Sequence, residues 1–259
     1  MEEYRSLSIK KLKDHARGRL IGRYGTAFLA AITILGAELI ITFFSGTGDS
    51  TPARYLLTLL IFTVADLLMG VLEYGESNLY LKITRSAKDV SVQDLFIGFK
   101  KNTDKAILVR AVFTGFSLIG IIPSTLYALK PDLFPSINAT LLAVLLSVFE
   151  YLMLFIAKLF FGLSFYILCD ESGLTAKEIL LKSLDLMKNK KGRLITIYLS
   201  MIPLCIVSIL AFGIGFIWFT ILLKAVVAMF YNDMLGEITG TLPIESATPD
   251  GSSTLDIRL

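Results

Sequence analysis

Histidine and cysteine are scarce in this sequence, and their scarcity limits the chemistry that the chain can carry. There is one histidine, His15, and there are two cysteines, Cys169 and Cys205. A zinc site takes several ligands that are mostly histidine or cysteine, and these residues form no such cluster. Glycine-rich phosphate loops are missing as well, since Gly213-Ile-Gly215 is too short for a nucleotide fingerprint. The sequence therefore predicts no metal site and no cofactor.

Charged residues are also few, and this excludes a soluble globular protein. They make up 18% of the chain, whereas 54% of the residues are hydrophobic and the mean hydropathy is +0.70. A helix needs about 20 apolar residues to cross the hydrocarbon layer of a membrane. The sequence predicts an all-α membrane protein, with six stretches of sufficient length at residues 24–44, 55–81, 106–128, 138–168, 193–212 and 214–235.

The distribution of basic residues orients these spans. Only Gly213 and Gly215 separate the last two, which predicts a tight hairpin, and one long bent helix is the alternative. With six spans, 21 of the 25 lysines and arginines fall on one side of the membrane, and only Arg54 and Lys130 lie in the opposite loops. Loops rich in lysine and arginine stay in the cytoplasm. We therefore expect six spans with both termini in the cytoplasm.

A unit of constant length recurs along the chain. Helix start signals occur at Ser8, Ser91 and Thr175, which are 83 and 84 residues apart. A fixed spacing of this kind indicates an internal repeat. We predict one membrane domain over residues 1–235 and a flexible cytoplasmic tail over 236–259. The domain is expected to hold three helical-hairpin repeats, each preceded by a cytoplasmic amphipathic helix, at about residues 6–82, 91–168 and 175–235.

Each repeat opens with a segment that has an apolar stripe and a face rich in lysine and arginine. In the first, Leu12, Ala16 and Leu20 share one side of a helix. Such a helix beside a membrane span is typical of one that lies in the headgroup layer, where it is attracted to anionic lipid. The alternative is that these segments only cap the bundle and fix its topology. The basic residues expected at the headgroups are Lys10, Lys13, Arg17, Lys100, Lys101, Lys182, Lys188, Lys190, Lys191 and Arg193.

Ionisable residues within the predicted spans are the next candidates for function, because a charge in the bilayer is costly unless it is paired or hydrated. They are Glu38, Asp66, Glu73, Glu150, Lys158 and Lys224. Three of them, Glu73, Lys158 and Lys224, lie 7, 8 and 7 residues before the tyrosines Tyr80, Tyr166 and Tyr231, which close the second, fourth and sixth spans at a cytoplasmic aromatic belt. This spacing places the three charges at equal depth, about 10–12 Å inside the membrane.

Equal depth predicts that these charges meet if the repeats pack around a pseudo-threefold axis. Glu73 would then neutralise Lys158 or Lys224 and leave a net positive site for an anion or an anionic lipid head. Asp66 lies on the same face of its helix as Glu73 and joins the candidate cluster. The alternative is that the lysines reach to the interface, and that the carboxyl groups form hydrogen bonds between helices.

Several sequence runs resemble a bacterial integral-membrane family. They are LKDHARGRLIGRYG (Leu12–Gly25), DLFIGFK (Asp94–Lys100), the run from Phe165 to Leu194, FGIGFIWF (Phe212–Phe219) and AMFYNDM (Ala228–Met234). Together they resemble the family known as domain of unknown function 975, over nearly the whole chain up to about Gly236. The resemblance implies a multi-pass protein of the bacterial plasma membrane, and it implies no activity.

We expect a protein that is not an enzyme. His15 lies beside Asp14 in a charged segment, where a solvated surface position is expected rather than catalysis. The leading hypothesis is a lipid-interacting or partner-binding subunit of an export, envelope or immunity system. Its expected partners are anionic membrane lipids and a membrane protein or a second copy of the chain. Nucleic acid is not expected, because topology explains the basic charge. The alternative is a small transporter or channel for an ion or anionic solute.

Overall fold

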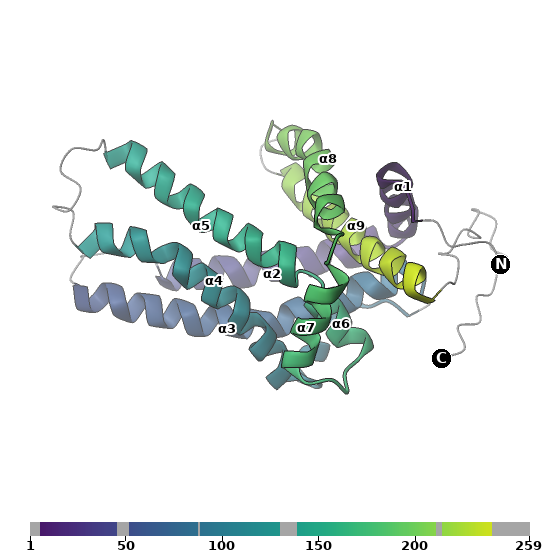
Figure 1. Ribbon diagram of the computed structural model, residues 1–259, viewed down its shortest axis with the longest axis horizontal. Coiled ribbons are helices and arrows are strands. Elements are labelled where there is room, and N and C mark those ends of the chain that lie inside the picture. Colours follow the sequence, from purple (N-terminus) through teal and green to yellow (C-terminus); the bar gives the residue numbers. More distant parts are fainter. Residues whose placement is uncertain (1–5, 46–51, 88, 130–138, 211–213, 240–259) are drawn as a thin grey trace.

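The computed structural model describes residues 6–45, 52–87, 89–129, 139–210 and 214–239, and all regular structure within them is helical (Figure 1). The elements in chain order are α1 (Ile9–Leu20), α2 (Tyr24–Ser45), α3 (Pro52–Thr84), the 3-10 helix η1 (Val92–Phe99), α4 (Thr103–Leu129), α5 (Ala139–Phe161), α6 (Ser164–Asp170), α7 (Ala176–Leu186), α8 (Lys191–Leu210) and α9 (Ile214–Thr239). The tail predicted from residue 236 begins with the last turn of α9, and residues 240–259 lie outside the described part.

Six stretches of helix are long and apolar enough to cross a membrane: α2, α3, α4, α5 with α6, α8 and α9. This confirms the predicted spans. Helices α2 to α5 run along the long axis of the molecule, and α8 and α9 form a shorter pair beside them (Figure 1). We call the end at which α2, α4 and α8 begin the basic end, and the opposite end the loop end. Both α1 and α7 lie toward the basic end, on the right of Figure 1.

Two spans show how the sequence sets local geometry. Residues predicted as a hairpin or a bent helix form two helices, α8 and α9, which pack so closely that a Cβ at Gly215 would lie 2.9 Å from the Cα of Ser208.

The fourth span, predicted as one helix, is interrupted after Phe161. Ser183 of α7 donates a hydrogen bond of 3.1 Å to the carbonyl of Phe160 beside this interruption. The packed α7 therefore helps to satisfy the interrupted backbone.

The predicted start signals act as helix caps. The side chain of Ser8 accepts a hydrogen bond from the backbone of Lys11, and Ser91 and Thr175 each form a capping box with the acidic residue three positions later. The segment after Ser91 differs from the expected helix, because it is a short 3-10 helix. Its apolar residues accordingly do not form one continuous face: Leu95 is buried, whereas Phe96 and Phe99 are exposed.

The three capped segments pack against the ends of different spans. α1 contacts α9, η1 contacts α3, and α7 contacts α6, so each lies against the second span of a neighbouring hairpin. Their apolar residues are taken up by the protein: Leu12, Ala16 and Leu20 of α1 and Ile179 of α7 have no exposed surface. For α1 and α7, the expectation that the apolar stripe faces the headgroup layer is therefore wrong. Contact with α9 and α6 removes the same apolar surface from water.

The tyrosines that were expected at an aromatic belt are instead in the core. The exposed fractions of Tyr80, Tyr166 and Tyr231 are 1%, 4% and 1%. The rings of Tyr166 and Tyr231 stack with their centroids 5.6 Å apart. Since α3, α6 and α9 end beside one another at the basic end, their last turns pack together rather than face lipid.

Gly75 is required for the contact between α3 and η1. A Cβ at this position would lie 1.8 Å from the carbonyl oxygen of Leu95, which is backbone and cannot rotate away. We predict that Gly75→Ala displaces η1 and lowers stability by about 1–3 kcal/mol. The matched control is Gly115→Ala in α4, where a Cβ meets nothing within 4 Å. Melting temperatures of the two variants in detergent test this, and equal values would contradict it.

Candidate functional site

A cavity of about 530 Å³ lies within the bundle and is lined by five of the six spans, α2, α3, α4, α5 and α9. Its lining includes every ionisable residue that the sequence placed inside the spans, and two more. The charged residues on its wall are Glu38, Asp66, Glu73, Glu76, Arg110, Glu150, Lys158 and Lys224. Helices from distant parts of the chain thus bring eight ionisable side chains to one hollow.

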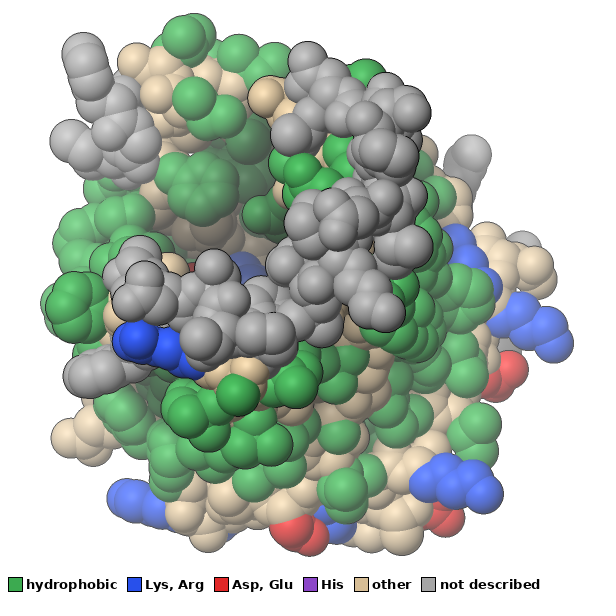
Figure 2. All heavy atoms as spheres, turned by 90° about the vertical axis from the view of Figure 1, so that its left-hand side faces the viewer, with side chains coloured by type: hydrophobic (Ala, Val, Ile, Leu, Met, Phe, Trp, Pro, Cys, Tyr) green, Lys and Arg blue, Asp and Glu red, His purple; other side chains and the backbone are tan. Residues whose placement is uncertain are grey.

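The cavity has a charged floor and an apolar rim. Figure 2 views the molecule from the loop end and shows a hollow surrounded by hydrophobic side chains, with basic and acidic side chains deep inside it. Phe62, Leu154 and Phe216 are among the apolar residues of its lining. A concave, partly apolar site with a few polar groups is the usual form of a small-molecule binding site.

Arg110 is the centre of the first charged group on the wall. Its Nη2 donates to Asp66 Oδ1 (2.5 Å), its Nε donates to Asp66 Oδ2 (3.3 Å), and its Nη1 donates to Glu73 Oε2 (2.5 Å). The hydroxyl of Thr114 donates to the same carboxylate of Asp66 (2.6 Å). Planar, forked pairing of this kind holds a guanidinium in one orientation. Arg110 therefore ties α4 to two positions on α3.

Lys224 of α9 forms the second group with Glu76 of α3. Its Nζ lies 2.7 Å from Glu76 Oε2, and the Glu76 side chain is 9% exposed. These pairs correct the predicted partners: Glu73 pairs with Arg110 rather than with Lys158 or Lys224. The two charged groups anchor α4 and α9 to neighbouring turns of α3.

Lys158, Glu38 and Glu150 remain on the wall without an ion pair or a side-chain hydrogen bond among the described residues. The side chains of Lys158 and Glu38 are exposed to the cavity. The charges that act on Lys158 are Lys224, Glu73, Arg110 and Glu76, so it belongs to the charged floor. An ammonium that is open to a cavity and lacks a partner is available to a ligand.

Acidic groups outnumber basic groups on this wall by five to three. The expectation of a net positive site is therefore wrong as a statement about the lining as a whole. The reason is that Glu76 and the carboxyl groups of α2 and α5 share the cavity with the lysines. Within the described residues, no three side chains among histidine, cysteine, aspartate and glutamate come together as metal ligands do.

Two members of the site were missed in the sequence. Arg110 falls inside the predicted limits of the third span but was not counted among the ionisable residues of the spans, and the structure places it in α4. Glu76 follows Glu73 by three residues, and this spacing puts both on one face of α3. The helical spacing from Asp66 and Glu73 was the signal that leads to Glu76.

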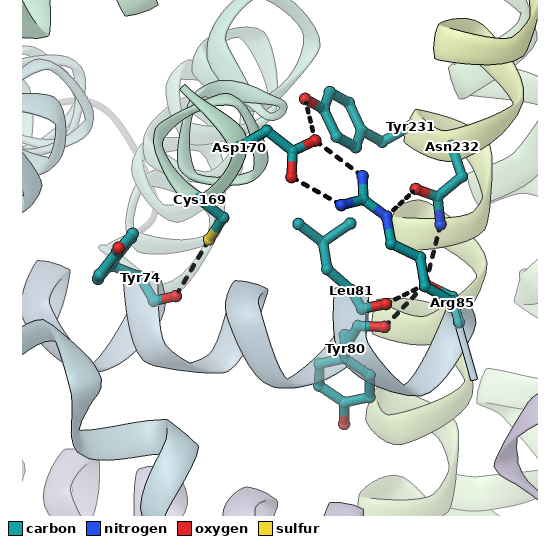
Figure 3. A network of polar contacts seen from close by, with 9 residues as sticks. Tyr74, Tyr80, Leu81, Arg85, Cys169, Asp170, Tyr231 and Asn232 are labelled. Carbon is teal, nitrogen blue, oxygen red and sulfur yellow. Dashed lines mark hydrogen bonds and ion pairs between the residues drawn. The ribbon is translucent and has the colours of Figure 1, made fainter. Parts of the chain in front are cut away.

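A second polar group joins the spans at the basic end (Figure 3). Arg85, directly after α3, forms a bidentate pair with Asp170 of α6, with both distances 2.7 Å. The hydroxyl of Tyr231 donates to Asp170 (3.0 Å), and Arg85 Nε donates to Asn232 Oδ1 (2.9 Å). Asn232 in turn donates to the hydroxyl of Thr84 (3.0 Å). We call these five residues the clamp, because they tie the ends of α3, α6 and α9.

The clamp keeps its arginine charged. Burial lowers the pKa of Arg85, but the hydrogen bonds and the negative charge of Asp170 outweigh it and raise the pKa above its ordinary value. The bidentate pair is therefore a charged one at every pH at which the carboxylate of Asp170 is ionised.

The basic residues that were expected at lipid headgroups divide into two sets. Five have exposed side chains: Lys10, Arg17, Lys100, Lys101 and Lys188. The others are partly buried, namely Lys13, Lys182, Lys190, Lys191 and Arg193.

Protein contacts account for the partly buried set. Lys13 donates to the carbonyl of Ser200 (3.5 Å), Lys182 pairs with Glu171, and Lys191 lies 3.5 Å over the ring of Phe160. Arg193 corrects the prediction most clearly, because it binds the fully buried carboxylate of Asp233 and the carbonyl of Leu7. Here the positive charge joins α8 to α9 and to the start of the chain.

Six helices long and apolar enough to cross a membrane, five of which line a charged cavity, indicate a multi-pass membrane protein. The chain belongs to the family described as Protein of unknown function (DUF975), whose model matches residues 7–237. This match covers all the helices that line the cavity and all three capped segments. No curated protein and no solved structure matches the chain.

Proposed function

We propose that this protein is a membrane carrier, not an enzyme, that binds a small charged solute in the cavity between its spans. The observation that carries the proposal is the ammonium of Lys158, which has no ion-pair partner among the described residues and lies on the wall of a cavity of about 530 Å³ inside the bundle. Ionisable side chains within membrane spans are costly, and they mark substrate or ion pathways. A protein that served only as a scaffold has no need for such a cavity.

The positions of the cavity and the clamp support a carrier with access from one side. By the positive-inside rule the basic end lies in the cytoplasm of a bacterium, with both termini inside and the loop end outside the plasma membrane. The cavity then opens outward (Figure 2), and the clamp closes the cytoplasmic ends of α3, α6 and α9 (Figure 3). A carrier of this kind alternates between a state open to the outside and a state open to the cytoplasm. A cavity that is open outside and closed at the cytoplasmic end is the arrangement of the first state.

An internal repeat also agrees with this role. The contacts of α1 with α9, η1 with α3 and α7 with α6 follow a cyclic order, as three hairpins around a pseudo-threefold axis require. Many transporters are built from repeats, with the solute site at the repeat interface. On this reading the cavity lies where the three hairpins meet.

The test is to identify what the protein retains when it is extracted from its native membrane into lipid nanodiscs. We expect one polar small molecule per protein in the wild type and its loss in Lys158→Met, which breaks no ion pair or side-chain hydrogen bond of the described residues. The matched control is Lys177→Met on the exposed face of α7, which should retain the molecule. Mass spectrometry of the denatured sample gives the result.

Two outcomes would contradict the carrier. Retention of the same molecule by Lys158→Met would remove this residue from the site. A stoichiometric protein partner together with an empty cavity would favour the role of a subunit in an export, envelope or immunity system.

A second candidate function, binding of anionic lipid, is favoured by the exposed part of η1. Phe96 and Phe99 are 43% and 57% exposed, with ring centroids 6.3 Å apart, and Lys100 and Lys101 follow them directly with exposed side chains. Aromatic rings beside lysines are typical of a segment that sits at a membrane interface. Replacing both phenylalanines by serine should weaken the retention of anionic lipid in nanodiscs while leaving the cavity unchanged.

A further inference from the structure

We infer that the solute bound in the cavity is a zwitterion, with its anionic group at Lys158 and its ammonium group toward Glu150. This inference rests on the proposed carrier function and adds the chemical class of its ligand. It follows from which charges on the wall already have partners and which do not.

The inner pole of the site is cationic. Arg110 forms ion pairs with Asp66 and Glu73, and Lys224 forms an ion pair with Glu76. Lys158 is the basic residue of the wall that has no ion pair within the described part of the chain. A carboxylate or phosphate of the ligand would supply the missing partner, and the charged floor would hold it by an ammonium hydrogen bond.

The outer pole is anionic. Glu150 lies on the same helix as Lys158, eight residues nearer the loop end, which is about 12 Å along the axis of α5. Glu150 forms neither a side-chain hydrogen bond nor an ion pair among the described residues. The ammonium of a ligand placed there would pair with this carboxyl group.

A ligand of one charge leaves part of this wall without a partner. An anion at Lys158 would bring a further negative charge into a cavity in which acidic groups are already in excess. A cation at Glu150 would leave the ammonium of Lys158 without a counter-ion inside the bundle. A charge removed from water needs a partner, so a molecule that carries both signs fits this site better than either.

Part of the cavity wall is apolar. Leu154 lies on α5 between Glu150 and Lys158, and Phe62 and Phe216 face the same cavity from α3 and α9. The middle of the ligand therefore contacts hydrocarbon. Short peptides have this pattern of charges at the two ends, and the ethanolamine phosphate head of a lipid has it over a shorter distance.

The experiment uses ligands that differ by one charge. Alanine, dialanine, trialanine and glycerophosphoethanolamine are titrated calorimetrically into the protein in nanodiscs without phosphatidylethanolamine. N-acetyl-trialanine and trialanine amide lack the positive and the negative charge respectively. We expect at least one zwitterion to bind, and each singly charged analogue to bind roughly tenfold to hundredfold more weakly, as expected for a lost charged hydrogen bond.

The variants assign each charge to its pole. Lys158→Met should bind the zwitterion and its amide with equal affinity, and Glu150→Gln should bind the zwitterion and its N-acetyl form with equal affinity. Lys177→Met, on the exposed face of α7, should behave as the wild type. Preference for peptides would indicate a diffusible solute, and preference for glycerophosphoethanolamine would indicate a lipid head.

Failure of the inference is distinct from failure of the carrier proposal. Suppose that N-acetyl-trialanine or trialanine amide binds more tightly than any zwitterion, and that this binding is lost in Lys158→Met. This result would overturn the inference of a zwitterionic ligand and would still support the proposed carrier. A zwitterion affinity that is unchanged in Lys158→Met would also overturn the inference. If no probe binds and native nanodiscs retain no small molecule, both proposals fall.

Discussion

Replacing Arg110 with methionine should leave little folded protein in the membrane. The substitution removes the only ion-pair partner described for Asp66 and Glu73 and leaves two carboxylates unpaired inside the bundle. Breaking a buried ion pair from one side costs about 3–5 kcal/mol, which is a large part of the stability of a domain. The measurement is the fraction of protein that stays monodisperse in mild detergent.

The control for Arg110 removes all three charges at once. Arg110→Met combined with Asp66→Asn and Glu73→Gln leaves no unpaired charge in this group, and we expect it to recover most of the folded fraction. Arg110→Lys keeps the charge but loses the forked geometry, and should be intermediate. A single variant as stable as the wild type would show that Arg110 does not hold α4 to α3.

Asp170→Asn should open the basic end of the bundle. It removes the charge from the bidentate pair with Arg85 and weakens the bond from Tyr231. Cys169 lies next to it, with its sulfur 3.7 Å from the carbonyl oxygen of Tyr74, and reports on the opening. We expect a thiol reagent to label Cys169 about 10- to 100-fold faster in this variant, as expected for the loss of one charged hydrogen bond.

Two controls accompany the labelling of Cys169. The experiment is done with Cys205→Ala, so that the remaining cysteine is the one at the clamp. Asp185→Asn, on the exposed face of α7, removes an equal charge away from the clamp and should leave the rate unchanged. Equal rates in Asp170→Asn and the parent would mean that the clamp does not limit access.

Much of the fold could be predicted from the pattern of apolar residues. Runs long enough to cross the bilayer marked the spans, and Ser91 and Thr175 marked helix starts through the side chains that cap them. The destination of the apolar stripes could not be predicted. Leu12 and Ile179 are buried against protein, and a stripe that packs on a helix has the same sequence pattern as one that lies in lipid.

The sequence predicted the depth of the charged residues in the membrane, but not which of them form ion pairs. Helical spacing placed Glu73, Lys158 and Lys224 at one level, and the structure has all three on one cavity. Which carboxylate meets which cation depends on how the helices are rotated about their axes. That rotation follows from close contacts such as those of Gly70, where a Cβ would lie 2.4 Å from the Cβ of Arg110, and a single sequence does not reveal them.

The contact of α1 with α9 has a consequence for the order in which the chain is made. The backbone of Leu7, just before α1, bonds to Asp233 of α9 and Arg193 of α8, so α1 is held by helices that are made later in synthesis. During synthesis α1 can contact the end of α3, but its contact with α9 forms only after the last span has been inserted. We therefore expect the bundle to close only after α9 has been inserted, and a chain that stops before α9 to expose part of the apolar face of α1 that holds Leu12, Ala16 and Leu20.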